Sequence, residues 1–252
     1  MNTQRRNAIL ELLNSKGEVS LKELETLFPT CSSMTLRRDL KYFEETGLAK
    51  RTRGGAVALS MLSITAEDVY SRRARENTAA KTLIAHKAVS FIESGRSFYL
   101  DSGTTVMLFA KEIPDDYFSI LTSGPNIALE LIKKQKPNVM LIGGVLNRNT
   151  ISISGANATS FLNGVNIDTA FMAASGFSLQ NGFTSGTYSE CELKQEVLRR
   201  ASSVIMLMDS SKCGKSLPYT FGTLKDIDVL VSDDNLPEEI KAAAAENGVT
   251  VI

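Results

Sequence analysis

Apolar residues recur at helical spacing in short segments at the start of the chain. Two predicted helices each place one apolar face inward, formed by Ile9, Leu10, Leu12 and Leu13 in the first and by Leu21, Leu24, Leu27 and Phe28 in the second. Gly17 ends the first helix, and Ser20 begins the second as an N-cap that forms a capping box with Glu23. Pro29-Thr30 ends the second helix, so the pattern predicts a pair of helices before residue 31.

The next segment predicts a third helix with two different faces. Ser32 is placed to cap its start, and Leu36, Leu40 and Phe43 share one face because they lie at i, i+4 and i+7. The opposite face is polar and basic, with Thr35 near its edge; it carries Ser33, Met34, Arg37, Arg38 and Lys41. After Gly47, the pattern predicts a hairpin formed by Leu48–Arg53, a Gly54-Gly55 turn and Ala56–Leu59. Three helices followed by a hairpin are the layout of a winged helix-turn-helix.

The polar face of this third helix fits a DNA major groove. An arginine fork donates two parallel hydrogen bonds to guanine O6 and N7, and a helix start favours a phosphate. We expect Arg37 and Arg38 to read or clamp DNA, and Thr35, Arg51 and Arg53 to contact phosphates. The full predicted DNA-binding set is Ser32, Ser33, Met34, Thr35, Arg37, Arg38, Lys41, Arg51 and Arg53. The alternatives are a charged helix on a solvated surface and a helix-turn-helix that contacts protein.

Beyond residue 60 the chain alternates between apolar runs and amphipathic helices. Strands are predicted at Ser97–Leu100, Ser119–Thr122, Val139–Ile142, Thr169–Ala174, Val204–Met208 and Asp228–Val231. Helices are predicted around Ile84–Ile92 and at Val106–Ile113, Ile127–Lys134, Ala156–Leu162, Glu190–Ala201 and Pro237–Glu246. This alternation indicates an α/β domain with a mostly parallel sheet. We expect a winged helix-turn-helix at residues 1–58, a linker at 59–75 and an α/β domain at 76–252.

Small polar residues follow these strands, at the sheet edge where ligands bind in α/β domains. The segment Asp101–Thr105 connects a strand to a helix, and its hydroxyls together with N–H groups at the helix start suit a phosphate. It is not a Walker A loop, because no Gly-Lys-Ser/Thr follows. Similar residues end other strands, at Thr122-Ser123-Gly124, Gly143-Gly144, Ser175-Gly176 with Gly182–Ser185 beyond it, and Asp209–Lys212. Each turn alone is ordinary, but together they predict an anionic ligand site.

Composition refines this division of the chain. Up to residue 58 there are ten Lys and Arg against seven Asp and Glu, whereas the remainder has eighteen against twenty-one. The net charge of +0 therefore hides a positive N-terminal part, as DNA binding requires. No apolar run is long enough to span a membrane, and the charged N-terminus is unlike a signal peptide. Cys31, Cys191 and Cys213 are widely spaced, which indicates reduced thiols and a cytoplasmic location.

The run from Arg6 to Gly55 resembles the DNA-binding half of the DeoR family of bacterial transcriptional regulators. The resemblance rests on V-S-L-K-E-L, S-x-x-T-L-R-R-D-L, E-x-T-G-L and R-x-R-G-G. Two departures stand out. Cys31 occupies the place of the family's usual valine before the capping Ser32, and Pro29-Thr30 is unusual in the turn.

The α/β part is similar to the DeoR-family sensor domain, which itself resembles ribose-5-phosphate isomerases. The matching motifs are D-S-G-T-T, I-G-G, D-x-A-F-x-x-A-x-G and D-S-S-K followed by Gly214-Lys215. The resemblance implies a phosphorylated sugar or sugar-derived effector, with its phosphate at Asp101–Thr105. The strand ends and the resemblance together predict the effector-binding residues Asp101, Ser102, Gly103, Thr104, Thr105, Thr122, Ser123, Gly143, Gly144, Ser175, Gly176, Thr184, Lys194 and Lys212. Where the family commonly has Thr-Asn-Ser, this chain has Thr122-Ser123-Gly124, which removes an amide contact.

An isomerase-like enzyme with an accessory helix-turn-helix is the alternative function. Acids and a base are available in Asp168, Glu190, Glu192 and Lys194. However, the spacing of Glu190 and Lys194 favours an ion pair on a helix surface. The single histidine, His86, and the three cysteines lack the neighbours of a metal site or a nucleophile, and neither GxSxG nor HExxH occurs. We therefore expect no catalysis, no cofactor and no metal.

The expected function is a transcriptional repressor of a sugar-catabolic operon that a phosphorylated sugar controls. It is expected to bind double-stranded operator DNA as a homodimer or homotetramer, because one recognition helix specifies too few base pairs, and to have no membrane partner. A third alternative is a DNA-binding protein whose larger domain only assembles the chain and binds no ligand.

Overall fold

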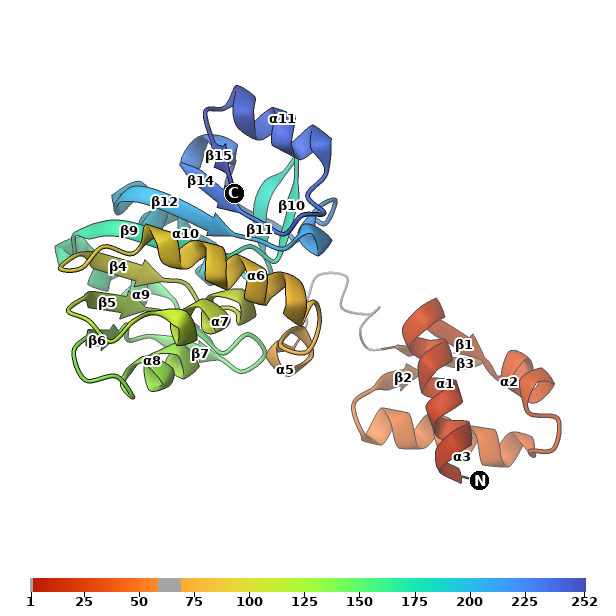
Figure 1. Cartoon of the computed structure of the whole chain (residues 1–252). Coiled ribbons are helices and arrows are strands. Elements are labelled where there is room, and N and C mark those ends of the chain that lie inside the picture. The colour runs from red at the N-terminus through yellow and green to blue at the C-terminus, as the bar shows by residue number, and fades with distance from the viewer. Residues whose placement is uncertain (1, 59–68) are drawn as a thin grey trace. The chain divides into compact units, whose positions relative to one another are not determined.

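The computed structural model describes residues 2–58 and 69–252, which form two compact units, Met1–Ala66 and Glu67–Ile252 (Figure 1). Most of the predicted linker, residues 59–68, lies outside the described residues. Residues 69–75, which the sequence pattern placed in the linker, contain helix α5 (Tyr70–Arg73) and pack within the second unit. The backbone N–H of Tyr70, for example, donates to the carbonyl of Asn149 at 2.7 Å.

The first unit is a winged helix-turn-helix, as predicted. Its helices are α1 (Asn2–Lys16), α2 (Leu21–Leu27) and α3 (Ser33–Glu45). Its antiparallel sheet has the order β1-β3-β2, with β1 at Glu18–Ser20, β2 at Ala49–Arg51 and β3 at Gly55–Ala58. The buried core joins all of these elements through Ile9, Leu13, Val19, Leu24, Leu36, Leu40, Phe43, Ala49, Ala56 and Ala58.

Three details of this unit differ from the sequence prediction. Strand β1 was not predicted, because three residues are too few to show a period of two. Leu27 is half exposed rather than buried. The Ser20 hydroxyl accepts the N–H of Glu23 at 3.1 Å as expected, but the Glu23 carboxylate pairs with Lys16 instead of completing a capping box. Ser20 is also the last residue of β1, where it pairs with Gly55.

The second unit contains a seven-stranded sheet with the order β15-β14-β12-β9-β4-β5-β6, in which every adjacent pair is parallel. The strands are β4 (Ser97–Leu100), β5 (Ser119–Thr122), β6 (Asn138–Leu141), β9 (Ile167–Met172), β12 (Ala201–Leu207), β14 (Val229–Val231) and β15 (Thr250–Val251). The α/β architecture with a mostly parallel sheet is therefore confirmed. The six predicted strands all occur, with ends displaced by up to three residues, and β15 is additional.

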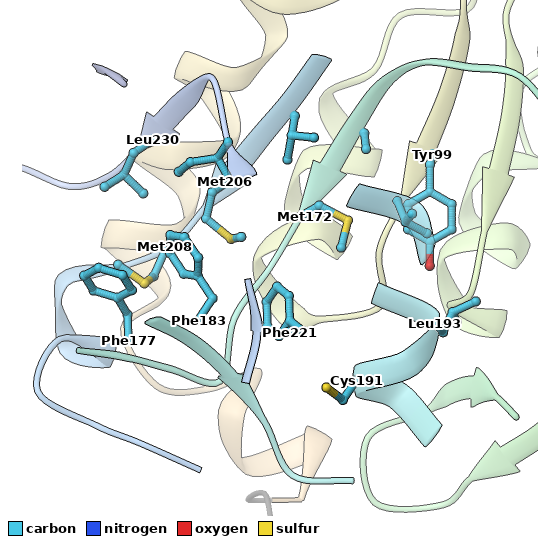
Figure 2. Close-up of a cluster of buried hydrophobic side chains, with 14 of the residues drawn as sticks. Tyr99, Met172, Phe177, Phe183, Cys191, Leu193, Met206, Met208, Phe221 and Leu230 are labelled. Atoms are coloured by element: carbon cyan, nitrogen blue, oxygen red, sulfur yellow. The ribbon is translucent and has the colours of Figure 1, made fainter. Parts of the chain in front are cut away.

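Helices cover both faces of this sheet. They are α6 (Thr78–Ala88), α7 (Thr104–Glu112), α8 (Pro125–Leu131), α9 (Ala156–Phe161), α10 (Tyr188–Arg200) and α11 (Glu238–Glu246), with single 3-10 turns at Val89–Phe91, Leu162–Gly164, Ser210–Lys212 and Leu224–Asp226. One apolar cluster lies between the sheet and α6, α7 and α8. The other lies on the opposite face with α9, α10 and α11, and Figure 2 shows its methionine and phenylalanine side chains meeting around Met206 and Phe221.

Two small antiparallel sheets were not predicted from the sequence. One pairs β7 (Val145–Asn147) with β8 (Ser152–Ser154), and the other has the order β10-β11-β13 at Gly176–Ser178, Gly182–Ser185 and Tyr219–Gly222. All five strands have only three or four residues, and β10, β11 and β13 contain glycine and hydroxyl side chains that are typical of turns. In addition, β11 pairs with β13, which lies more than thirty residues later in the chain.

Candidate DNA-binding surface and effector site

Helix α3 presents the predicted basic face to solvent. The Ser32 hydroxyl accepts the N–H of Thr35 at 3.3 Å and caps the helix start. Leu36, Leu40 and Phe43 are buried as predicted. The exposed side carries Ser33, Met34, Arg37, Arg38 and Lys41, and Thr35 is intermediate, at the edge of the buried face. The helix period therefore places this part of the predicted DNA-binding set on one surface.

Two grooves flank the exposed face of α3, and Arg37 borders both. One groove, of about 410 Å³, lies between α3 and the wing hairpin, where Arg51, Thr52 and Arg53 line it. The other, of about 540 Å³, is lined by Arg38 and Lys41 together with Met34 and Arg6. Arginines on both sides of the helix can follow a DNA backbone on either side of a groove.

The wing is held against α3 by Arg51. Its guanidinium Nε lies 2.8 Å from Glu44 Oε2, and its backbone N–H donates to Glu44 Oε1 at 3.1 Å. These two hydrogen bonds lower the pKa of the Glu44 carboxyl. Arg51 therefore positions the wing strand, whereas the exposed Arg53 next to the turn carries a guanidinium that can reach a phosphate.

Asp39 follows the two arginines but points the other way, a role that the sequence reasoning missed. It is buried, and its carboxylate accepts Arg5 Nε at 2.6 Å and Arg6 Nε at 2.8 Å. The Arg6 guanidinium also lies 3.9 Å from the ring centre of Tyr42. Asp39 lies three residues after the buried Leu36, so helical spacing places its side chain on the buried face. Its cations, from α1, could not be identified because they lie more than thirty residues away.

In the second unit, Asp101 and Lys194 form a buried ion pair at the carboxyl ends of the parallel strands. Asp101 directly follows β4, and its carboxylate also accepts the N–H groups of Ser102 at 2.8 Å and Ala173 at 3.0 Å. Lys194 reaches it from α10 and donates to the Ala173 carbonyl at 2.8 Å. Glu190 lies 3.7 Å from the same ammonium group. The predicted ion pair of Glu190 and Lys194 therefore occurs, but its predicted place on the helix surface is wrong, because both side chains are buried.

Seven of the predicted effector residues line one narrow cleft above this ion pair: Ser102, Gly103, Thr104, Thr105, Ser175, Lys194 and Lys212. Arg73, Thr150, Ala173, Ala174 and Glu190 complete the lining. Helix α7 begins at this cleft, with Gly103 at φ +148, a conformation that favours glycine. The cleft therefore combines a helix N-terminus, small hydroxyls and cationic side chains, which together bind anions.

The remaining predicted effector residues are not brought to this cleft. Asp101 lies beneath it in the ion pair described above. Thr122, Ser123 and Thr184 are buried and engaged, since Thr122 Oγ1 accepts the Gly124 N–H, Tyr99 donates to Ser123 Oγ, and Thr184 Oγ1 donates to the Gly176 carbonyl. Gly143 and Gly144 are exposed outside the cleft. Gly176 pairs with Thr184 in the small sheet, where a side chain would meet the Lys215 carbonyl.

The segment after the linker adds residues that the sequence reasoning missed. Arg73 lines the cleft, and Lys81 is buried beside it with its ammonium 2.7 Å from the Glu76 carbonyl and also bonded to the Arg73 carbonyl. Burial lowers the pKa of Lys81. Asn77 donates to Ser211 Oγ at 2.8 Å and to Asp209 at 3.3 Å, which fastens the segment to the loop that carries Lys212. The basic S-R-R-A-R-E-N run, residues 71–77, was the sequence signal that could have indicated these contacts.

Asp168 does not belong to the cleft, which corrects the grouping of acids considered for catalysis. It lies at the start of β9, where it accepts the backbone N–H of Ser97 at 2.8 Å and the Ser97 hydroxyl at 3.0 Å. Those bonds lower the pKa of the Asp168 carboxyl. Because β4 and β9 are parallel, this is the amino end of the sheet, opposite Asp101.

Comparison with known proteins agrees with both units. The family model described as DeoR-like helix-turn-helix domain matches residues 5–61, and the DeoR C terminal sensor domain matches residues 76–234. The HTH-type transcriptional regulator GlpR of Haloferax volcanii is 31% identical over 99% of this chain and 96% of its own length. IolR of Bacillus subtilis is 30% identical over 96% and 95%, and a putative aga operon transcriptional repressor of Escherichia coli O157:H7 is 29% identical over 99% and 93%.

Among solved structures, ribose 5-phosphate isomerase A of Methanocaldococcus jannaschii is 17% identical, with a TM-score of 0.41 over 55% of each chain. No helix within residues 2–58 and 69–252 has the length and apolar character of a membrane span. Nor does that part of the chain contain a group of three or more His, Cys, Asp or Glu side chains that could hold a metal ion.

Proposed function

The chain belongs to the DeoR family of transcriptional regulators, and from that premise we propose that it represses a sugar-catabolic operon under the control of a phosphorylated sugar. In this proposal α3 and the wing bind operator DNA, with Arg37 and Arg38 at the bases or backbone and Arg53 at a phosphate. The effector binds in the cleft at the start of α7 and weakens the hold on DNA.

The observation that carries the proposal is the chemistry of that cleft. Its described lining holds three cationic side chains, Arg73, Lys194 and Lys212, and one carboxylate, Glu190. Thr104 and Thr105 stand at the first turn of α7, where backbone N–H groups have no partner within the helix. An anion with several oxygens is the ligand that such a site favours, and a phosphate monoester has them.

The cleft is nearly closed, which suggests how binding is communicated. Its volume is about 20 Å³, which is room for about one water molecule. A sugar phosphate is larger, so its entry requires the rim to move. Arg73 lines the cleft and belongs to α5, near the start of the second unit. Displacement of α5 would therefore alter the chain segment that leads to the DNA-binding unit.

We propose that the cleft binds its ligand without turnover. The Lys194 ammonium forms an ion pair with Asp101 and donates to the Ala173 carbonyl, so it is poorly placed to accept a proton. Asp168 is at the other end of the strands. Incubating the purified protein with pentose and hexose monophosphates should yield no isomer or hydrolysis product. Turnover that is lost in Glu190→Gln would instead favour the enzyme alternative.

Reciprocal titration tests the regulatory proposal. Operator affinity is measured by fluorescence anisotropy on DNA from upstream of the gene, with and without each monophosphate, and with inorganic phosphate as a control. Linkage requires the effector to lower operator affinity, and the operator to lower effector affinity, by the same factor. Equal effector affinity in the presence and absence of operator would contradict the proposal.

A further inference from the structure

Strand β6 forms an open edge of the parallel sheet, next to α8 (Figure 1). The eleven residues from Pro137 to Asn147, which include this strand, carry no charged side chain. Proteins usually protect an open strand edge by charges, by proline within it or by very short length. The opposite edge, β15, has only two residues, whereas β6 has four. Of the two edges, β6 is thus the one suited to pairing with another strand.

Two residues of β6 direct their backbone N–H and C=O groups away from the sheet. The N–H of Asn138 donates to Phe118 at 2.8 Å and that of Ile142 to Thr122 at 3.1 Å, so both face β5. Because alternate residues of a strand direct their N–H and C=O groups to opposite sides, Val139 and Leu141 direct theirs away from β5. No strand among the described residues pairs with that side.

Exposed apolar side chains flank this edge on both faces of the sheet. On the face covered by α8, Leu129 is 64% exposed, Ile132 is 61% exposed, and Leu141 is also exposed. On the other face, Val145 and Leu146 of β7 are 72% and 57% exposed. β7 belongs to that face because its partner strand places Ile153 in the second apolar cluster. Exposed apolar side chains on both sides of an unpaired strand are typical of an interaction site.

We propose that this edge is a homodimer interface, in which β6 of two copies pair antiparallel around a two-fold axis perpendicular to the sheet. The N–H and C=O groups that point outward set the register. Val139 of one copy forms a hydrogen-bonded pair with Leu141 of the other, and the Met140 residues of the two copies lie opposite each other on the axis. With such an axis, equivalent helices of the two copies lie on the same face of the joined sheet. The axis therefore places α8 beside α8 of the second copy, where Leu129 and Ile132 become covered.

A second copy is the occupant because the edge is complementary to itself. An uncharged strand meets an identical strand with no like charges opposed, and the symmetric interface closes as a dimer. The choice also rests on the proposed function, because one winged helix specifies too few base pairs and a two-fold dimer supplies two.

Sedimentation of the full chain, without DNA or effector, tests the interface. Leu141→Pro removes an outward N–H while the N–H groups of Asn138 and Ile142 still bond to β5, so a solvent-facing edge tolerates it. Leu129→Glu adds a charge to α8. We expect the molar mass of both variants to fall about twofold, with circular dichroism like that of the unsubstituted protein. Leu179→Glu is the matched control; Leu179 is 52% exposed near a different groove, and its variant should keep the original mass.

The register has its own test. Met140→Cys should form a covalent dimer under mild oxidation, because the Cα atoms of opposed residues in a pair without hydrogen bonds lie about 4.5 Å apart, within disulfide reach. A monomeric unsubstituted chain, or unchanged masses for Leu141→Pro and Leu129→Glu, would overturn the proposal. Dissociation by Leu179→Glu alone would move the interface to β10 and β11. Since neither DNA nor effector is present, failure of the regulatory proposal leaves these outcomes unaffected.

Discussion

Neighbouring residues of α3 have opposite roles because a helix turns by about 100° per residue. Arg37 and Arg38 face solvent, whereas Asp39 is buried against the arginines of α1. The same separation of roles occurs in the second unit, where Asp101 ties down Lys194 while the next residues, Ser102–Thr105, line the cleft. In both units a buried carboxylate lies next to residues of the proposed binding surface and holds their segment in place.

Replacing Arg38 by alanine should weaken operator binding by roughly 1–3 kcal/mol, about 5- to 150-fold, if its guanidinium makes a bidentate base contact. Fluorescence anisotropy at fixed salt measures this loss. Lys225→Ala removes the same charge from an exposed position of the other unit and should leave affinity nearly unchanged. Unaltered affinity and sequence preference in Arg38→Ala would remove this residue from the contact surface.

Removing the ammonium group of Lys194 should destabilise the second unit. Lys194→Ala leaves the Asp101 carboxylate buried without its cation, and breaking a buried pair in this way costs about 3–5 kcal/mol. Thermal unfolding followed by circular dichroism measures the loss. Lys241→Ala breaks a surface pair with Glu238, which is worth roughly 0–1 kcal/mol. Equal melting temperatures for the two variants would refute the structural role of Lys194.

The wing depends on one close backbone approach. A Cβ on Gly55 would lie 1.9 Å from the carbonyl oxygen of Val19, whereas one on Gly54 would meet nothing within 4 Å. The sheet β1-β3-β2 therefore has no room for a side chain at position 55 unless β3 moves away from β1. This explains why the two adjacent glycines, which look equivalent in the sequence, have different requirements.

Gly55→Ala should separate β3 from β1 and destabilise the first unit by about 1–3 kcal/mol, as overpacking does. DNA affinity should fall with it, because the wing loses its support. Gly54→Ala is the matched control and should leave both stability and affinity close to those of the unsubstituted protein. The comparison is made by urea unfolding and anisotropy. A Gly55→Ala protein as stable as its control would show that β1 and β3 separate without penalty.

At the scale of the whole molecule, the chain has two units, and each unit has its own hydrophobic core. Unfolding should therefore occur in two transitions. A sugar phosphate should raise the unfolding temperature of the second unit alone. At a concentration of one hundred times its Kd, it should add about 2.7 kcal/mol to the free energy of unfolding of that unit. Calorimetry with and without the ligand measures this. A shift of the first unit's transition alone would place the effector elsewhere.

Local order in the sequence determined most of the architecture. Apolar spacing of 3.6 residues, the serine caps and the glycine turns indicated the winged helix-turn-helix, and the alternation of apolar runs with helices indicated the parallel sheet. Six of the seven predicted residues that line the cleft followed from one rule, that parallel strands end at a common edge, and the seventh, Lys194 on α10, followed from the family resemblance. These signals lie within a few residues of one another, so the sequence alone contains them.

Tertiary structure decided which distant residues meet. Asp39 and Arg5 are 34 positions apart, and Asp101 and Lys194 are 93 apart, so neither ion pair has a local signal. The antiparallel strands β10, β11 and β13 look like turns until chain folding brings them together. Glu190 and Lys194 were expected on the helix surface, and their burial likewise depended on where α10 packs. Periodicity determines which way a residue points along its own element, but only packing determines what it meets.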